Sequence, residues 1–250
     1  MIETGKVQTS VAAGVATITF SHPKGNSLPG TLLASLASAV TASGSDDAAK
    51  VIVLRSGGTG PFCAGASFSE LKAVSSEAEG SAFFSGFAKL ILAMIRAPKF
   101  ILTRVQGKVV GGGVGIVAAS DYVVAVRSSS VRLSELAIGL GPFVVGPPIE
   151  KKIGVAAFSA FAADADWRDA EWAERHGLFS RLADDAGALD REVEARAKFF
   201  TASSPEAMEK LKLVFWAGTD GWDDLLKARA ATSGGLVLSD FTRKAIQSLG

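Results

Sequence analysis

The chain has 250 residues, of which 48% are hydrophobic and 20% charged, a composition typical of a globular protein with a sizeable core. Its 26 lysines and arginines nearly balance its 25 aspartates and glutamates, which argues against a general nucleic-acid or polyanion binder. One cysteine and two histidines exclude an intramolecular disulfide framework and a metal centre rich in cysteine or histidine.

The N-terminal segment MIETGKVQTS lacks the basic and apolar regions of a signal peptide. Apolar stretches along the chain are interrupted by Gly, Lys or Arg within about a dozen residues, whereas a bilayer span needs roughly 20. We therefore expect a cytoplasmic protein without a membrane segment.

The first half of the chain alternates between β-rich runs and amphipathic helical patterns. The predicted strands are 7–11, 15–20, 51–56, 100–105 and 122–126, and the predicted helices are 28–40 and 83–95. The first two strands flank AAG and predict a hairpin, and VIVLRS (51–56) is apolar enough for a sheet that is buried on both faces. The order strand, glycine loop, helix, strand occurs twice, which predicts α/β layering with right-handed crossovers.

Beyond about Gly154, strand-like runs almost disappear. The predicted helices there are 167–176, 186–200, 205–216, 222–232 and a short one near 240–249. No Pro- or Ser-rich linker separates this part from the rest. We therefore divide the chain into a core of residues 1–190 and a C-terminal helical subdomain of residues 191–250, which together form a single continuous domain in practice.

Two glycine-rich loops lie at strand-to-helix junctions, GGTGPFCAGAS (57–67) and VVGGGVG (109–115). A dinucleotide site is one interpretation of the second loop, because residues 113–118 fit G-x-G-x-x-A. That motif also needs an acidic residue about 20 positions on, and Arg127 follows the next strand instead. The first loop lacks the Gly-Lys-Ser/Thr of a phosphate loop.

Another interpretation is that both loops point backbone N–H groups at one oxygen. The first N–H groups of a helix have no partner within the helix, and two that converge form an oxyanion hole. The alternative is that both loops are simply tight turns, and the residues alone leave both open. No serine lies in a G-x-S-x-G elbow. We expect His22 and His176 to be surface or capping residues, and Cys63 to be a packing residue.

Five segments together resemble the crotonase superfamily, the enoyl-CoA hydratase/isomerase group. They are, in chain order, HPKGNSLPGTLL, GPFCAGASFSEL, GKVVGGGVGIVAASDYVVA, SELAIGLGP and WAERHGLFSRL. The resemblance implies an α/β spiral of ββα units with a C-terminal helical trimerisation subdomain, and a homotrimer or a dimer of trimers. It also implies an acyl-CoA thioester as the substrate, with coenzyme A as part of that substrate, no further cofactor and no metal.

The same resemblance implies the site residues. The backbone N–H groups of Ala66 and Gly112 would hold the thioester oxygen, and Glu135 would be the acid/base; the glycines would let the backbone approach that oxygen. The residues expected to bind the substrate or coenzyme A are Lys24, Ala64, Ser67, Phe68, Gly111 and Phe143. Ser67 stands where the family usually has an aspartate, Phe143 predicts a reshaped acyl pocket, and Lys24 also fits an exposed turn.

A hydratase of this family commonly uses two glutamates, and Gly115 stands at the second position. A single carboxylate in a dry pocket can still move a proton between two carbons, because desolvation raises its pKa towards the working pH. The resemblance therefore implies an enoyl-CoA hydratase/isomerase that leans towards isomerisation. The alternative is a non-catalytic module of the same fold that binds CoA esters or a partner protein.

Overall fold

The computed structural model describes residues 5–248, and its main feature is a six-stranded sheet. The strand order is β1-β2-β3-β4-β6-β9, with β1 antiparallel to β2 and every other neighbour parallel. The strands are β1 Lys6–Ala12, β2 Val15–Ser21, β3 Val51–Ser56, β4 Phe100–Val105, β6 Tyr122–Val126 and β9 Arg181–Ala183. The hairpin and the three apolar strands that follow it are as expected, whereas β9 is an additional edge strand.

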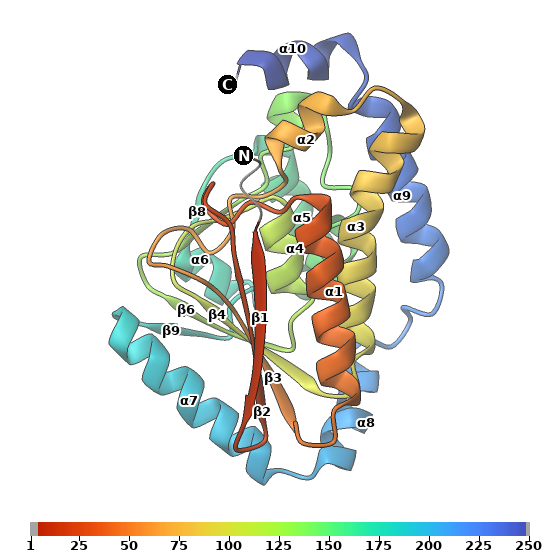
Figure 1. The fold of residues 1–250 in the computed structure, drawn as a ribbon. Helices are drawn as coiled ribbons and strands as arrows, with labels where there is room; N and C mark the ends of the chain where they lie inside the picture. Colours follow the sequence, from red (N-terminus) through yellow and green to blue (C-terminus); the bar gives the residue numbers. More distant parts are fainter. Residues whose placement is uncertain (1–4, 249–250) are drawn as a thin grey trace.

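Helices cover both faces of this sheet (Figure 1). Against one face lie α1 (Gly30–Ser45), α3 (Glu77–Arg96) and α4 (Gly112–Ala118), which share a large apolar core with the sheet. Against the other face lies α7 (Ala186–Ala202), which packs a smaller apolar cluster on β3, β4, β6 and β9. Because helices bury both faces of the sheet, the sequences of its central strands are continuously apolar.

A second, three-stranded sheet extends from the glycine loop. It pairs β5 (Val109–Val110) with β7 (Ser130–Arg132), and β7 in turn with β8 (Arg168–Asp169). The glycine loop is therefore held at its start by β5 and at its end by α4, which packs in the main core.

Helix α3 is the longest helix of the core and begins six residues earlier than its apolar pattern predicts. Ser76 caps its first turn through a hydrogen bond from the N–H of Glu79 to the Ser76 hydroxyl (3.3 Å). This helix is long and apolar enough to cross a membrane, in contrast to the expectation that no stretch is long enough. It packs between α1 and α9, as a core helix does.

The C-terminal helices fold back on the core of their own chain. They are α8 (Pro205–Phe215), α9 (Trp222–Leu236) and α10 (Asp240–Ser248). Helix α9 runs along α3, and α10 lies over α2 (Phe68–Ala73) at one end of the molecule (Figure 1). The boundary expected at residue 190 falls inside α7, which packs on the main sheet, so the sheet and the helical region share this element.

Two further helices complete the chain, α5 (Gly146–Asp164) and α6 (Ala170–Arg175). The sequence pattern did not predict α5. Its first turn contains two prolines, and Gly154 interrupts it with a φ of 78°, so its apolar residues do not follow one continuous helical period.

Candidate active site

A largely apolar cavity lies where the two glycine loops, α3 and the 134–145 segment meet. It encloses about 600 Å³ of space, with its open mouth included. Its lining residues are Ala64, Gly65, Ala66, Phe68, Leu71, Phe84, Phe87, Val110, Gly111, Gly112, Ser134, Glu135, Ile138, Leu140, Gly141, Pro142, Phe143, Val144, Val145 and Ser233. Concave, mostly apolar sites with a few polar groups are typical of small-molecule binding.

The first glycine loop is held in place by the turn that follows β2. The side-chain amide of Asn26 donates to the carbonyls of Gly57 (3.0 Å) and Pro61 (2.9 Å). The N–H of Leu28 donates to the carbonyl of Gly65 (2.8 Å). Asn26 is 6% exposed, so these bonds form in the interior, where they fix the loop that carries Ala66.

The second glycine loop is compact because protein atoms press against it. A Cβ at Gly112 would lie 2.1 Å from Cε1 of Phe87, and one at Gly113 would lie 2.7 Å from Cβ of Cys63. Gly111 has a φ of 51°, and a Cβ there would lie 3.0 Å from Oε1 of Glu135. Packing inside the protein therefore also requires glycine at positions 112 and 113, and Gly111 lies against the candidate catalytic group.

Two backbone N–H groups of the cavity wall are free. Within residues 5–248, neither the N–H of Ala66 nor that of Gly112 donates a hydrogen bond to the protein. The N–H of Ser67 donates to Leu28 (3.3 Å) and that of Gly111 to Arg132 (2.9 Å). Gly112 is the first residue of α4, where N–H groups have no partner within the helix, and both residues line the cavity, so these two donors are available to a ligand oxygen.

Glu135 places its carboxyl group in the same cavity. The residue as a whole is partly buried, but Oε2 is enclosed and has no hydrogen-bond partner within the described chain. Burial raises the pKa of this carboxyl group to about 7, and this effect outweighs the opposing one of the backbone N–H groups of Glu135 and Ser134. A carboxyl group with a pKa near neutrality can both take and return a proton.

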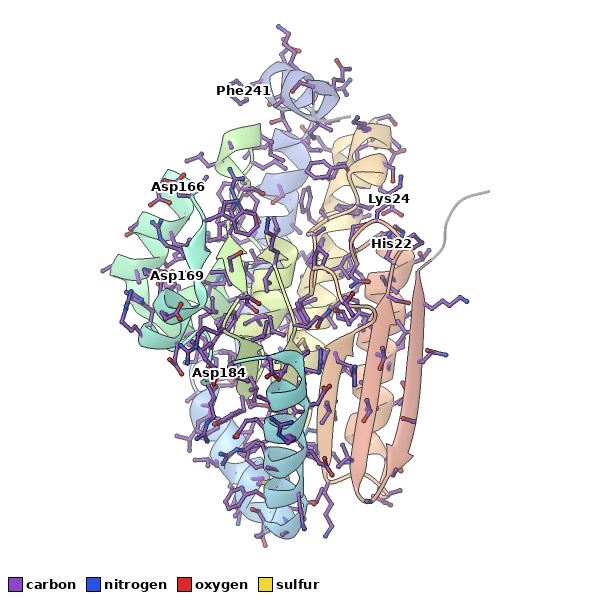
Figure 2. The ribbon with its side chains drawn as sticks, turned by 90° about the vertical axis from the view of Figure 1, so that its left-hand side faces the viewer. His22, Lys24, Asp166, Asp169, Asp184 and Phe241 are labelled. Atoms are coloured by element: carbon purple, nitrogen blue, oxygen red, sulfur yellow. The ribbon has the colours of Figure 1, made fainter. Side chains whose placement is uncertain are left out.

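Seven of the nine expected site residues line this cavity: Ala64, Ala66, Phe68, Gly111, Gly112, Glu135 and Phe143. Ser67 does not, because it is buried as the N-cap of α2, where its hydroxyl accepts from the N–H of Glu70 (3.4 Å). Lys24 does not either. It is exposed beside His22 in the turn after β2 (Figure 2).

The three residues expected to have no catalytic role are held by local contacts. Cys63 is fully buried, and burial raises the pKa of its thiol to about 12, so it packs and does not supply a thiolate. The Nδ1 atom of His22 lies 3.0 Å from the hydroxyl of Ser27, and His176 stacks on Trp172. Among residues 5–248, no three His, Cys, Asp or Glu side chains gather as they would to hold a metal ion.

Several lining residues were not expected from the sequence. Phe84 and Phe87 come from α3, Ser233 from α9 and Val145 from the turn before α5. A Cβ at Gly115 would lie 2.6 Å from Cγ1 of Val145, so this valine fills the space next to the position of the absent second glutamate. Phe84 and Phe87 lie within the predicted helix 83–95, but nothing local in the sequence indicated that they border a cavity.

Comparison with known proteins identifies the family. The family model described as "Enoyl-CoA hydratase/isomerase" matches residues 10–245. The chain belongs to the enoyl-CoA hydratase/isomerase family. The family fold, the crotonase fold, is the one expected from the sequence.

Relatives and solved structures agree with this assignment. A mitochondrial methylglutaconyl-CoA hydratase from Rattus norvegicus is 30% identical over 199 residues, which are 78% of this chain and 63% of the relative, so the match spans less than two thirds of that protein. An enoyl-CoA hydratase from Bacillus halodurans has a TM-score of 0.90 at 18% identity, with 97% of this chain and 99% of that chain covered. A putative enoyl-CoA hydratase from Mycobacterium avium paratuberculosis has a TM-score of 0.86 at 26% identity, with 98% and 96% covered.

Proposed function

We propose that this protein is an acyl-CoA enzyme of the enoyl-CoA hydratase/isomerase type. One observation carries the proposal: the free N–H groups of Ala66 and Gly112 and the carboxyl group of Glu135 line the same apolar cavity. Donors placed where negative charge develops, next to a group that moves protons, are what enolate chemistry at a thioester requires.

The proposed mechanism begins with ionised Glu135 taking a proton from the α-carbon of a 3-enoyl thioester. The electron pair of that C–H bond moves into the carbonyl, and the N–H groups of Ala66 and Gly112 donate to the resulting enolate oxygen. Protonated Glu135 then returns the proton to the γ-carbon, and the double bond moves to the 2-position. No atom is gained or lost, and one carboxyl group suffices.

Hydration is the other reaction of this class. It requires a group that activates water as well as one that delivers a proton, and the apolar Val145 next to Gly115 offers no second carboxylate there. This observation favours isomerisation over hydration. It also supports a second candidate, a module that binds CoA esters or a partner protein without turnover.

Mass spectrometry in D₂O tests these alternatives. Wild type and Glu135→Gln are incubated with 2-enoyl- and 3-enoyl-CoA esters. We expect wild type to shift the double bond with deuterium at the α- or γ-carbon, and the variant to bind the esters while its rate falls by about 100- to 10,000-fold. Addition of water would instead identify a hydratase. Binding of the esters by wild type without any turnover would support the non-catalytic module.

We also propose a homotrimer or a dimer of trimers in the cytoplasm. Helix α8 supports the assembly, because Leu213 and Val214 are each 69% exposed on it, and contiguous exposed apolar groups mark interfaces. Mass photometry of wild type and Leu213→Glu tests this, and we expect the variant to shift towards the monomer. A monomeric wild type would contradict the assembly.

The names of the mitochondrial relatives raise the question of the acyl group. Methylglutaconyl-CoA is the thioester of a dicarboxylic acid and so has a second carboxylate. Whether this protein takes such an acyl group depends on the charges of its own cavity.

A further inference from the structure

The two glycine loops leave the main sheet from adjacent strands. The first loop, residues 57–67, follows β3, and the second, residues 109–115, follows β4 after a short connection. Strands β3 and β4 are parallel neighbours, so their carboxyl ends lie side by side. The N–H groups of Ala66 and Gly112 are therefore carried on separate loops, and the distance between them depends on how these loops are fixed to each other.

Backbone contacts join the two loops around Cys63. Its N–H donates to the carbonyl of Lys108 (3.3 Å), and its carbonyl accepts from the N–H of Val110 (2.9 Å). Gly107 adds a close approach, because a Cβ there would lie 2.8 Å from the carbonyl oxygen of Gly60. These contacts fix the register of the two segments, and each of them precedes the donor residue along its own loop.

The side chain of Gln106 joins the same segments at the edge of the sheet. This residue comes directly after β4, and its Nε2 atom donates to the hydroxyl of Ser56, the last residue of β3 (2.7 Å). The same atom lies 3.5 Å from the carbonyl oxygen of Pro61 in the first loop. That carbonyl also accepts from the amide of Asn26 (2.9 Å), so two side-chain amides converge on one point of the first loop.

Arg104 decides which end of the Gln106 amide faces the first loop. The Oε1 atom of Gln106 lies 3.4 Å from Nη1 of Arg104. Arg104 is 5% exposed, and its Nε donates to the carboxylate of Asp190 on α7 (2.5 Å), which holds the guanidinium in place. Because a guanidinium only donates hydrogen bonds, the oxygen of the amide must face it, and the NH₂ group is directed at Ser56 and Pro61.

We propose that Gln106 is a positioning residue: its amide holds the first glycine loop against the second, so that the N–H groups of Ala66 and Gly112 reach the same oxygen. The inference rests on the proposed acyl-CoA function. Within residues 5–248 the cavity wall does not include Gln106, so its effect on the substrate passes through the loops. Donors to a developing oxyanion act over narrow distances, and a misplacement of about 1 Å can lower a rate by about 100-fold.

The variant Gln106→Met tests this role, because methionine keeps the approximate length of the side chain and removes both polar ends of the amide. With a 3-enoyl-CoA ester we expect kcat to fall by about 10- to 100-fold and KM to change by less than about 3-fold, because the donors act on charge that develops in the transition state. Gln8→Met on the exposed strand β1 is the matched control and should change neither. An unchanged kcat, or a loss confined to KM, would overturn the proposal.

The variant Gln106→Glu separates the hydrogen bonds from packing. Its carboxylate can still accept from Arg104 and from the hydroxyl of Ser56, but it cannot donate to the carbonyl of Pro61. We therefore expect kcat to fall as far as in Gln106→Met, while the ion pair with Arg104 keeps the protein folded, which thermal melting checks. A kcat equal to that of wild type would overturn the role of the donated hydrogen bond.

A ligand that is not turned over separates this inference from the proposed function. A saturated 3-ketoacyl-CoA loses a proton from its α-carbon to the buffer, the electron pair moves into the thioester carbonyl, and the enolate is measured by its ultraviolet absorbance. At one pH we expect the ratio of bound enolate to bound ketone to be about 10-fold higher in wild type than in Gln106→Met. This difference would uphold the inference even if no enoyl ester were turned over. Equal ratios in the two proteins, or no enolate in either, would overturn it even if wild type were an active isomerase.

Discussion

The side chain of Val145 occupies the space that any side chain at position 115 would need. A Cβ built on Gly115 would lie 2.6 Å from Cγ1 and 2.7 Å from Cβ of Val145. Gly115 stands where the family commonly has a second glutamate, and Val145 packs against its backbone. The site is closed at this point by an apolar contact.

From this contact we predict that Gly115→Ala destabilises the protein by about 1–3 kcal/mol, because the added methyl group overpacks the interior. Val145→Ala in the same chain should recover much of this loss, which a double-mutant cycle in urea measures. Gly235→Ala is the matched control. It lies within α9 with no atom within 4 Å of its Cβ position, so it should be neutral or slightly stabilising. Independent effects of the substitutions at 115 and 145 would contradict the contact.

Glu135 is predicted to make stability depend on pH. Its pKa is raised from 4.5 to about 7 in the folded protein, so the folded state holds a proton that the unfolded state has released between these values. This contribution to stability is fully present below about pH 4.5 and is lost as the pH rises through about 7. Relative to wild type, Glu135→Gln should gain about 3 kcal/mol between pH 4.5 and pH 8.

Urea unfolding of wild type and Glu135→Gln across this pH range measures the difference. The comparison cancels the titration of the groups that both proteins share. A difference that does not change with pH would show that the carboxyl group is hydrated and not desolvated.

The pair formed by Lys212 and Asp121 is predicted to be essential for the packing of α8 on the core. Their charged atoms lie 2.8 Å apart, with 3% and 1% of the side chains exposed, and burial lowers the pKa of Lys212. We expect Lys212→Met to cost about 3–5 kcal/mol, because Asp121 would remain buried without its counter-charge. Equilibrium unfolding measures this loss.

Lys210→Met is the matched control on the same helix. Lys210 pairs with Glu206 one turn away, and both side chains are largely exposed, so its loss should change stability little. Similar effects of the two substitutions would contradict a special cost of the buried pair.

Phe143 is predicted to limit the length of the acyl group. Its ring lies against Gly141, with Cε2 and Cζ 2.7 Å from the position of a Cβ there, and it lines the cavity. Phe143→Ala should enlarge the cavity, so that the preferred acyl chain becomes longer. We expect kcat/KM for the longer chain, relative to the chain that wild type prefers, to rise by about 10-fold. Kinetics on a series of chain lengths measures this, and an unchanged profile of Phe143→Ala would place the ring outside the acyl path.

The sequence by itself was sufficient to predict most strands of the main sheet. VIVLRS, FILTRV and YVVAV form β3, β4 and β6 with the bounds expected from the sequence. Such runs are local signals, because a strand buried on both faces must be apolar throughout. The resemblance to the crotonase superfamily also predicted Glu135 and both glycine loops as parts of the site, and the structure brings them to one cavity.

The tertiary structure decided what the chemistry of the site can be. It leaves the N–H groups of Ala66 and Gly112 free, raises the pKa of Glu135 by burial and fills the space beside Gly115 with Val145. It also brings Ser233 of α9 into the cavity wall. None of these properties belongs to one segment. Each arises where chain segments that are distant in sequence exclude water or leave a backbone group without a partner. The local periodicity of the sequence does not predict such contacts.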